Sequence, residues 1–317
     1  MSQSEPLITI FSAPKPFTDP HISLIQRNAI GSWQHLGDEV QVLMMGDEAG
    51  MDDFAAEAGI QPLQDVSRNH QGTPLVNSIF ELARQNSKSP LLAYVNADIV
   101  LLPEFVSLTK RVFNQANEFL IVGQRWDLEL KQPLVFNQDW DVRLLFDVKT
   151  RGRLHPPGGS DYFVFPRQCF TDVPRFAIGR AGWDNWMFYH ARSQDWPVID
   201  LSMSLTVIHQ DHDYSHLPGG QPHYKMPESF ENIQLAGGRR TIFTLLDADY
   251  QLQAGKLQLI PARGKRFWRR FETYPLLHWN SNPLAELTFA ICHPLKAFGE
   301  WRGRLAYKLN SFRHQKT

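Results

Sequence analysis

The sequence predicts a doubly wound α/β protein, because strand-like apolar runs alternate with helical patterns from residue 7 to about residue 125. Short apolar runs bounded by turn residues predict strands at 7–11, 40–45, 91–95 and 119–122. Apolar residues at helical spacing predict helices at 21–36, 52–58, 74–84 and 105–113, and Asp19-Pro20 gives the first of these a start signal. Because a helix that links two strands of one sheet leaves them parallel, we expect a parallel core with helices on both faces.

The regular alternation fades in the second half of the chain. We expect a loop at 158–161, strands at 162–165 and 201–208, and a helix at 182–192. Past about residue 239, residues 267–298 mix Trp, Phe, Leu and Arg in an amphipathic, Pro-interrupted pattern. The sequence therefore predicts one domain over residues 1–240 and a basic, aromatic, mostly helical extension over residues 241–317.

The composition is that of an ordinary soluble globular protein. The 317 residues are 43% hydrophobic and 21% charged, which is ample for a sizeable core. Cys169 and Cys292 lie too far apart in sequence to indicate a disulfide or metal framework. The first ten residues lack the features of a secretory signal, and no apolar run is long enough for a spanning helix. We expect a cytoplasmic protein.

The net charge of −1 conceals a basic C-terminal segment. Residues 261–317 contain eleven Lys and Arg against three Glu, so the remainder of the chain is acidic. Basic residues at 263–270 interleave with Phe267, Trp268 and Phe271. Such a segment could contact anionic lipid head groups at the inner face of a membrane, or a lipid-diphosphate acceptor. A packed helix with a solvated basic edge is the other main interpretation, and nucleic acid is not the expected partner.

The segment 91–102, LLAYVNADIVLL, places polar side chains where a buried strand should end. A carboxylate such as Asp98 beside an apolar strand is costly unless a cation or a fixed donor pairs with it. Strand ends in open α/β sheets are where ligands bind. The pattern Asn96-Ala97-Asp98 therefore indicates a ligand site, although Asn and Asp are also common in ordinary turns.

The order of these segments resembles that of a known enzyme group. The segment RNHQGTPLVN, residues 68–77, precedes a helix and then the strand that ends in Asn96-Ala97-Asp98. Together with the early strands, this arrangement resembles the GT-A glycosyltransferases, particularly their family 2-like inverting group. The resemblance implies a Rossmann-like GT-A fold with a mixed sheet, a nucleotide-diphosphate sugar as donor, and a saccharide or glycolipid acceptor.

The resemblance also implies roles for individual residues. It implies contacts to the nucleotide sugar from Ser12, Ala13, Pro14, Asp47, Arg68, Asn69, Asn77, Asn96, Asp98 and Asp161. Asp98 corresponds to the acid that meets the metal ion, whereas Asn96 stands where such enzymes have an acid that meets the ribose. Asn can still bind a hydroxyl, but this departure leaves metal-independent action open.

The segment AIGRAGWDNW, residues 177–186, resembles the glycine loop and acidic helix start of the same enzymes. A carboxylate there benefits from the helix N-terminus and can accept a proton from an acceptor hydroxyl. We therefore predict Asp184 as the general base. The alternative is that Asp184 only caps the helix.

The segment HQDHDYSH, residues 209–216, follows the expected strand 201–208. The resemblance implies a metal-binding His about 25 residues past the acidic helix start, where His209 stands. His209 is the first choice of ligand and His212 the second, with Mn²⁺ or Mg²⁺ as the ion. The glycine pair before Asp161 has two interpretations. It marks either a loop whose backbone could approach a donor sugar or a plain turn.

Two other functions remain open at this point. The spacing of His209, His212 and His216 is compatible with a zinc-dependent hydrolase. Asn96 is compatible with a catalytically silent module that only binds nucleotide sugars. The sequence does not choose the donor nucleotide, the donor sugar or the acceptor.

Overall fold

The computed structural model describes residues 5–158, 160–211 and 223–303, and contacts between residues divide the chain into two compact units. The first unit is Met1–Ile260 and the second is Pro261–Thr317. The first unit reaches past the boundary expected at residue 240, because β12 (Tyr250–Gln253) pairs in parallel with β10 (Val198–Asp200) and joins the main sheet.

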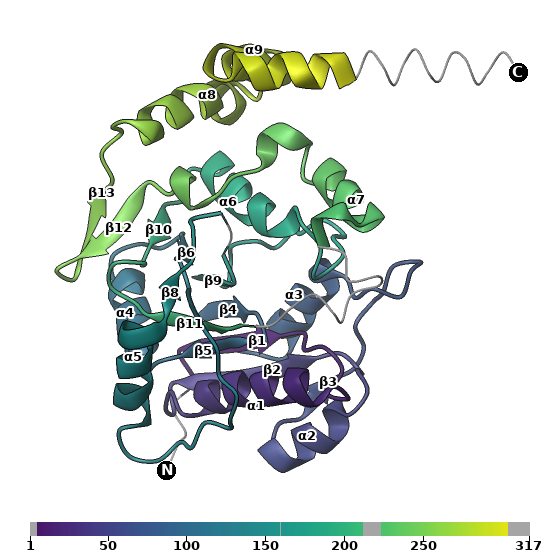
Figure 1. Ribbon diagram of the computed structural model, residues 1–317, viewed down its shortest axis with the longest axis vertical. Coiled ribbons are helices and arrows are strands. Elements are labelled where there is room, and N and C mark those ends of the chain that lie inside the picture. The colour runs from purple at the N-terminus through teal and green to yellow at the C-terminus, as the bar shows by residue number, and fades with distance from the viewer. Residues whose placement is uncertain (1–4, 159, 212–222, 304–317) are drawn as a thin grey trace, which may run out of the picture. The chain divides into compact units, whose positions relative to one another are not determined.

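Within the described residues, nine strands form the main sheet of the first unit, in the order β13-β12-β10-β6-β9-β4-β1-β2-β3 (Figure 1). Adjacent strands are parallel, except that β9 is antiparallel to β4 and β6, and β13 to β12. The remaining bounds are β1 (Ile8–Ser12), β2 (Val40–Met45), β3 (Pro62–Leu63), β4 (Leu91–Val95), β6 (Leu120–Val122), β9 (Tyr162–Pro166) and β13 (Lys256–Leu259). The mixed, doubly wound α/β class predicted from the sequence is confirmed.

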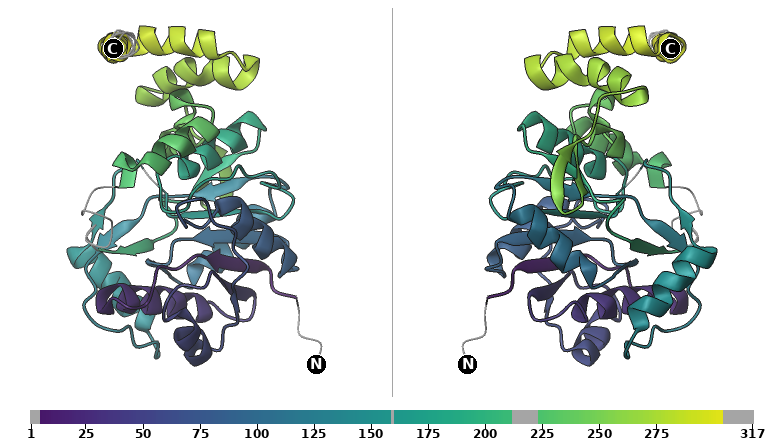
Figure 2. Two further views of the ribbon diagram at one scale, coloured as in Figure 1. Left: turned by 90° about the vertical axis from the view of Figure 1, so that its right-hand side faces the viewer. Right: turned by 90° about the vertical axis from the view of Figure 1, so that its left-hand side faces the viewer.

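Helices cover the main sheet from both sides (Figure 2). They are α1 (Pro20–Gln34), α2 (Met51–Ala58), α3 (Val76–Gln85), α4 (Glu104–Phe113) and α6 (Trp183–Ser193), and further helices are α5 (Trp140–Arg151), α7 (Pro227–Leu235), η2 (His223–Lys225), η3 (Arg239–Thr241) and η4 (Leu245–Asp247). The Asp19 side chain accepts hydrogen bonds from the amides of His21 and Ile22, so it caps α1, and Pro20 occupies the first turn. The predicted start signal of this helix is thus observed.

The winding of the main sheet reverses between β1 and β4. The chain adds β2 and β3 on one side of β1 and then crosses to place β4 on the other side. Loops that leave the carboxyl ends of two such strands diverge and open a crevice between them. The fold therefore puts the segment after β1 and the Asn96-Ala97-Asp98 segment after β4 at the same edge.

A second, small sheet has the order β5-β11-β7-β8. Its strands are β5 (Ile99–Leu101), β7 (Trp126–Leu128), β8 (Arg153–Leu154) and β11 (Val207–Gln210). The strand expected at 201–208 is therefore wrong for residues 201–206, and only residues 207 and 208 of that range belong to β11. Ser202 hydrogen bonds to the Asp200 carboxylate through both its amide and its hydroxyl, which turns the chain out of β10 before β11 begins.

The core of the first unit is apolar on both sides of the main sheet. The central strands β1 and β4 are buried along their whole length, as expected for strands covered by helices on both faces. Trp33 of α1 is fully buried, and its indole nitrogen donates to the Ile99 carbonyl at 2.9 Å. This bond links α1 to the small sheet.

The second unit contains α8 (Lys265–Trp279) and α9 (Asn282–Cys292), which pack against each other. The mostly helical C-terminal extension predicted from the sequence is thus confirmed. Ser281 caps α9 through the Leu284 amide, and Pro283 occupies its first turn. Among the described residues, no helix combines the length and apolarity that crossing a bilayer requires.

Candidate functional site

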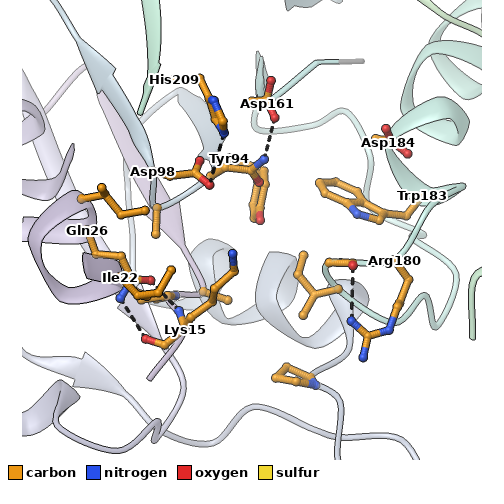
Figure 3. Close-up of a pocket in the computed structure, with 18 of the residues that line it drawn as sticks. Lys15, Ile22, Gln26, Tyr94, Asp98, Asp161, Arg180, Trp183, Asp184 and His209 are labelled. Atoms are coloured by element: carbon orange, nitrogen blue, oxygen red, sulfur yellow. Dashed lines mark hydrogen bonds and ion pairs between the residues drawn. The ribbon is translucent and has the colours of Figure 1, made fainter. Parts of the chain in front are cut away.

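A cleft of about 840 Å³ opens at the edge of the main sheet where the winding reverses. Its lining includes Ala13 and Pro14 from the segment after β1, and Asn96 and Asp98 from the segment after β4. Figure 3 shows Asp98 and His209 on one wall and Trp183 and Asp184 across the cleft from them. Residues that the sequence singled out from four separate segments therefore share one cavity.

The register of the small sheet brings Asp98, His209 and Asp127 together. In β11, His209 pairs with Ile99 of β5, the residue after Asp98, and with Asp127 of β7. His209 Nε2 lies 3.8 Å from Asp98 Oδ2, while Nδ1 lies 3.3 Å from Asp127 Oδ1. The two ring nitrogens thus face different carboxylates.

Asp127 is a buried carboxylate among basic side chains. It lies 3.1 Å from Arg125 Nε, 2.9 Å from His155 Nδ1 and 3.4 Å from Arg153. Although burial opposes ionisation, the hydrogen bonds from His209 and His155 and the charge of Arg125 hold the pKa of Asp127 far below its usual value. Asp127 is therefore a fixed negative charge that orients its neighbours.

His209 is nearly buried, and its surroundings favour the charged imidazole. Burial alone would lower its pKa, but the Asp127 hydrogen bond and the Asp98 charge raise it. Ligand atoms of Asp127, His209 and Asp211 all lie within 4.8 Å of one another. A cation binds the neutral ring and would displace its proton, and imidazole and carboxylate donors at this spacing fit a divalent cation such as Mn²⁺ or Mg²⁺.

The chemistry of the donors separates two ways of holding a cation. Asp127 already has three basic partners, which leaves it poorly suited as a ligand. A His that binds a metal through one ring nitrogen commonly donates the other N–H to a carboxylate. The arrangement therefore fits a cation between Asp98 and His209 Nε2, with Asp127 orienting the ring.

Asn96 is tied into the wall of the cleft. Its amide Nδ2 donates to Asp161 Oδ1 at 3.0 Å, and its backbone amide donates to the Asp161 carbonyl at 2.9 Å. Arg125 donates to the other Asp161 oxygen at 2.6 Å. An acid at position 96 would be repelled by the Asp161 carboxylate. The Asn96 amide can instead donate a hydrogen bond to it, and this keeps the two side chains in contact. This role was not foreseen from the sequence.

Asp184 lies in the first turn of α6 on the opposite wall. Its carboxylate accepts a hydrogen bond from the Gly182 amide at 3.2 Å, so it also contributes to the helix start. Burial nevertheless raises the pKa of Asp184 to about 6, with a smaller contribution from the Asp161 charge, while hydrogen bonds from backbone amides act in the opposite direction. A carboxylate with this pKa is a stronger base than an exposed Asp.

The loop that presents Asp184 is held by α7. The Asn232 side chain exchanges two hydrogen bonds of 2.9 Å with the backbone of Ala177. Gly182 has a φ of 112°, and a Cβ there would meet the backbone of residues 232 and 233 at 3.2–3.3 Å, so only glycine fits. This contact explains the glycine that precedes Trp183 in the sequence motif.

An aromatic pair lines the cleft between the two walls. The rings of Tyr94 and Trp183 meet edge to face, with centroids 5.0 Å apart, and both residues line the cavity. Flat apolar side chains beside polar groups are typical of a site that takes a ring-shaped polar ligand.

Lys15 extends into the cleft from the segment after β1 (Figure 3). Its backbone is fixed by the buried Gln26, which accepts from the Lys15 amide at 2.6 Å and donates to its carbonyl at 2.9 Å. Burial lowers the pKa of Lys15, and the Asp98 charge partly restores it. The cleft thus contains a cation close to Asp98.

The other predicted contact residues are distributed unevenly. Ala13, Pro14, Arg68 and Asp161 line the cleft, but Ser12, Asp47, Asn69 and Asn77 are not among its lining residues. Arg68 pairs with Asp47 and with Glu48, and it is Glu48 that lines the cleft.

Asn69 and Asn77 have other surroundings. The Asn69 side chain accepts hydrogen bonds from the amides of Gln71 and Thr73, and it donates to Glu228 at 2.6 Å. It therefore shapes its own loop and links that loop to α7. Asn77 lies on α3 and lines a separate cavity of about 180 Å³. His212 and His216 lie outside the described residues.

Sequence reasoning missed Asp127, Lys15 and Arg125. Asp127 and Arg125 belong to a short stretch, QRWDL, that carries no motif, and only strand pairing places it beside His209. Lys15 offered a weak signal, since it follows Ala13 and Pro14 in a segment already expected to border the ligand.

No model of a protein family matches this sequence, and neither does any curated protein sequence. Solved structures do resemble the chain. S. aureus TarS 1-349 in complex with UDP-GlcNAc has a TM-score of 0.47 and 11% identity, over 72% of this chain and 65% of that one. M. tuberculosis glucosyl-3-phosphoglycerate synthase has a TM-score of 0.47 and 14% identity, over 74% and 82%.

A third structure is the mannosyltransferase PcManGT from Pyrobaculum calidifontis in complex with GDP-Man and Mn²⁺, with a TM-score of 0.41 and 10% identity, over 67% and 59% of the two chains. This chain therefore spans less than two thirds of the lengths of TarS and PcManGT. GT-A glycosyltransferases, the class that the sequence motifs resemble, are thus among the similar structures. At these identities and TM-scores the similarity assigns no activity to this chain.

Proposed function

We propose that this chain is a glycosyltransferase that moves a sugar from a nucleotide-diphosphate sugar to a hydroxyl group of an acceptor, with inversion. One observation carries the proposal: Asp98 and His209, which suit a cation, line the same cleft as Asp184, which suits a base. The cleft volume of about 840 Å³ leaves space for a ligand between them. A transferase that stabilises a departing diphosphate and activates an acceptor needs these two functions on opposite sides of the sugar.

Asp98 and His209 Nε2 would hold the cation, and Asp127 would fix the orientation of the His209 ring through Nδ1. A bound Mn²⁺ or Mg²⁺ supplies positive charge to the phosphates of the leaving group. Lys15 adds a second positive charge on the same wall. The chain's own ammonium group can therefore bear part of the leaving-group charge, which suits a site where Asn96 replaces an acid.

Asp184 would accept the proton of the acceptor hydroxyl as that oxygen attacks the anomeric carbon. With a pKa of about 6, its carboxylate is mostly ionised at neutral pH and still basic enough to take up a proton. General base catalysis of this kind contributes roughly 10²–10⁴-fold to a rate. Trp183 and Tyr94 would pack against a sugar ring between the two walls.

The donor nucleotide and the acceptor are proposed only as classes. The donor is a UDP- or GDP-sugar, and the acceptor is a saccharide or a glycolipid. A cytoplasmic location with peripheral contact at a membrane is compatible with a glycolipid acceptor.

A metal-dependent hydrolase is the second candidate function. It would hold zinc on His209 and Asp211, whose ligand atoms lie within 4.8 Å of each other, together with His212 and His216, which follow in the sequence. Metal analysis of the purified protein separates the candidates. Tightly held zinc without affinity for nucleotides would favour hydrolysis, whereas a catalytically silent module would bind nucleotide sugars without transfer or hydrolysis.

The decisive experiment is a thermal-shift screen of UDP, GDP and their sugars, each with and without Mn²⁺. A ligand that binds the folded protein raises the unfolding midpoint by mass action, so a selective rise names the donor class. The same screen on Asp98→Asn should lose the part of the rise that depends on Mn²⁺. Transfer by wild-type protein and loss of transfer in Asp184→Asn with donor binding retained would support the mechanism, and absence of any nucleotide-dependent shift would refute the proposal.

A further inference from the structure

Two rows of large apolar side chains lie exposed on the second unit, and we refer to them as the apolar rows. The row on α8 consists of Phe267, Phe271 and Tyr274, which are 42–51% exposed, and the row on α9 consists of Leu284, Leu287 and Ile291, which are 40–57% exposed. Spacings of three and four residues place each row on one face of its helix. Leu295, Phe298 and Trp301, in the helical residues that follow, are exposed as well.

The apolar rows are not the core of the helix pair itself. Leu276, Ala285 and Phe289 are buried. The Thr288 hydroxyl donates to the Glu272 carbonyl at 2.8 Å, and His293 lies 3.0 Å from the Glu272 carboxylate, so polar contacts also join α8 to α9. The exposed rows are therefore additional apolar surface on helices that already pack together. Several large apolar side chains exposed along one face of a helix indicate a binding surface.

Positive charge accompanies the apolar rows. The described residues 261–303 contain seven Lys and Arg and three Glu. Glu272 is buried and faces Arg269 and His293, so it presents little negative charge to a partner. Lys265 near the start of α8 and Lys296 beyond the end of α9 are both exposed. An anionic partner with an apolar interior matches this surface in both charge and hydrophobicity.

Among anionic partners, a lipid bilayer fits best. Helices that bind in the interfacial plane of a bilayer combine bulky apolar side chains on one face with Lys and Arg around it. Leu284, Leu287 and Ile291 are aliphatic and have no planar face on which a nucleic-acid base could stack. A second copy of this chain would bring like charges together. Because no described helix is suited to spanning a bilayer, a surface position is the one that these helices can take.

We propose that the apolar rows and their flanking Lys and Arg residues dock this chain on the surface of an anionic lipid bilayer. The helices lie in the head-group region, with the rows directed toward the acyl chains and the basic side chains at the phosphate level. This docking does not depend on the proposed glycosyltransferase activity, so either can fail without the other.

The test is flotation of the full-length protein with vesicles of phosphatidylcholine alone or of phosphatidylcholine mixed with phosphatidylglycerol. We expect binding to the mixed vesicles and loss of most binding in about 1 M salt, where the Debye length falls to about 3 Å. Lys265→Gln combined with Lys296→Gln should weaken binding roughly 30-fold. The matched control is Lys88→Gln with Lys149→Gln, which removes two exposed charges from the first unit.

The apolar rows are tested by Phe271→Ser combined with Leu287→Ser, which should weaken binding at least tenfold. The matched control is Val142→Ser with Phe146→Ser, two exposed apolar side chains of α5. An unchanged thermal unfolding midpoint shows that each variant is folded. Equal binding to both kinds of vesicle, or equal losses in test and control variants, would overturn the proposal. So would self-association without vesicles that the row variants abolish, because that result identifies a second copy as the occupant.

Discussion

Replacing Asp184 by Asn should stabilise the protein at neutral pH while abolishing transfer. Burial raises the pKa of Asp184 from 3.8 to about 6, so the cleft disfavours the ionised form by about two pKa units, which corresponds to at most about 3 kcal/mol. Because Asp184 lines an open cleft, solvent reduces this value, and we expect about 1–3 kcal/mol. Asn keeps an oxygen that can accept the hydrogen bond from the Gly182 amide.

The sign of the effect depends on pH. A carboxyl group whose pKa is raised in the folded state contributes its full stability at a pH below its pKa in the unfolded state, which is near 4. That contribution is lost as the pH rises through about 6, the pKa in the folded state. The free energy of unfolding of Asp184→Asn should therefore match that of the wild type near pH 4 and exceed it at pH 8. Urea unfolding at pH 4, 6 and 8 measures the difference, with Asp65→Asn as a control at an exposed carboxylate.

An equal difference at all three pH values, or a wild type that is the more stable protein at pH 8, would refute the reasoning. The same ionisation should appear in the rate. If Asp184 is the base, kcat/KM rises with pH through about 6, and a rate that is flat across this range would remove Asp184 from that role.

Three further predictions concern the opposite wall. Lys15→Met should weaken binding of UDP or GDP by about 10–100-fold, as expected for a lost charged hydrogen bond, without changing binding of the bare nucleosides. Calorimetric titration measures this, with Lys110→Met as a control outside the cleft lining, and equal affinities of wild type and Lys15→Met would count against Lys15. Asn96→Asp should destabilise the fold by about 1–3 kcal/mol at pH 8, because a carboxylate would replace the amide that donates to Asp161, and an unchanged urea midpoint would contradict this. If His209 binds the metal as proposed, Asp127→Asn should weaken Mn²⁺ binding by about 10–100-fold, since the His209 ring loses its orienting partner. A Mn²⁺ titration followed by electron paramagnetic resonance measures this, and unchanged affinity would remove Asp127 from that role.

Much of the architecture could be predicted because its signals are local. β2 and β4 end where their apolar runs end, and Asp19-Pro20 begins α1 as expected. A helical spacing or a capping residue acts on neighbouring residues, so the sequence alone reveals it. The two walls of the cleft could also be predicted, since Asp98 and Asp184 each follow a motif at the end or start of an element.

The remaining parts depend on contacts between distant residues. Nothing near Asp127 indicates that it lies beside His209, because strand pairing across 82 positions of sequence brings them together. The position of Asn96 was predicted but its partner was not, since Asp161 reaches it from the start of the antiparallel strand β9. The break between β10 and β11 was missed because residues 201–208 alternate apolar and polar side chains as a strand does, and nothing in that pattern reveals the turn that Ser202 forms with the Asp200 carboxylate.

The strands of the small sheet come from distant parts of the sequence, and this affects when the sheet can form during synthesis of the chain. Its strands come from residues 99–101, 126–128, 153–154 and 207–210, so the proposed cation site cannot form until the last of these has left the ribosome. The earlier strands of the main sheet can pair long before that point, because domains build up from their N-terminal parts during translation. A nascent chain arrested before residue 207 should therefore hold much of the α/β scaffold and yet have no affinity for the ion.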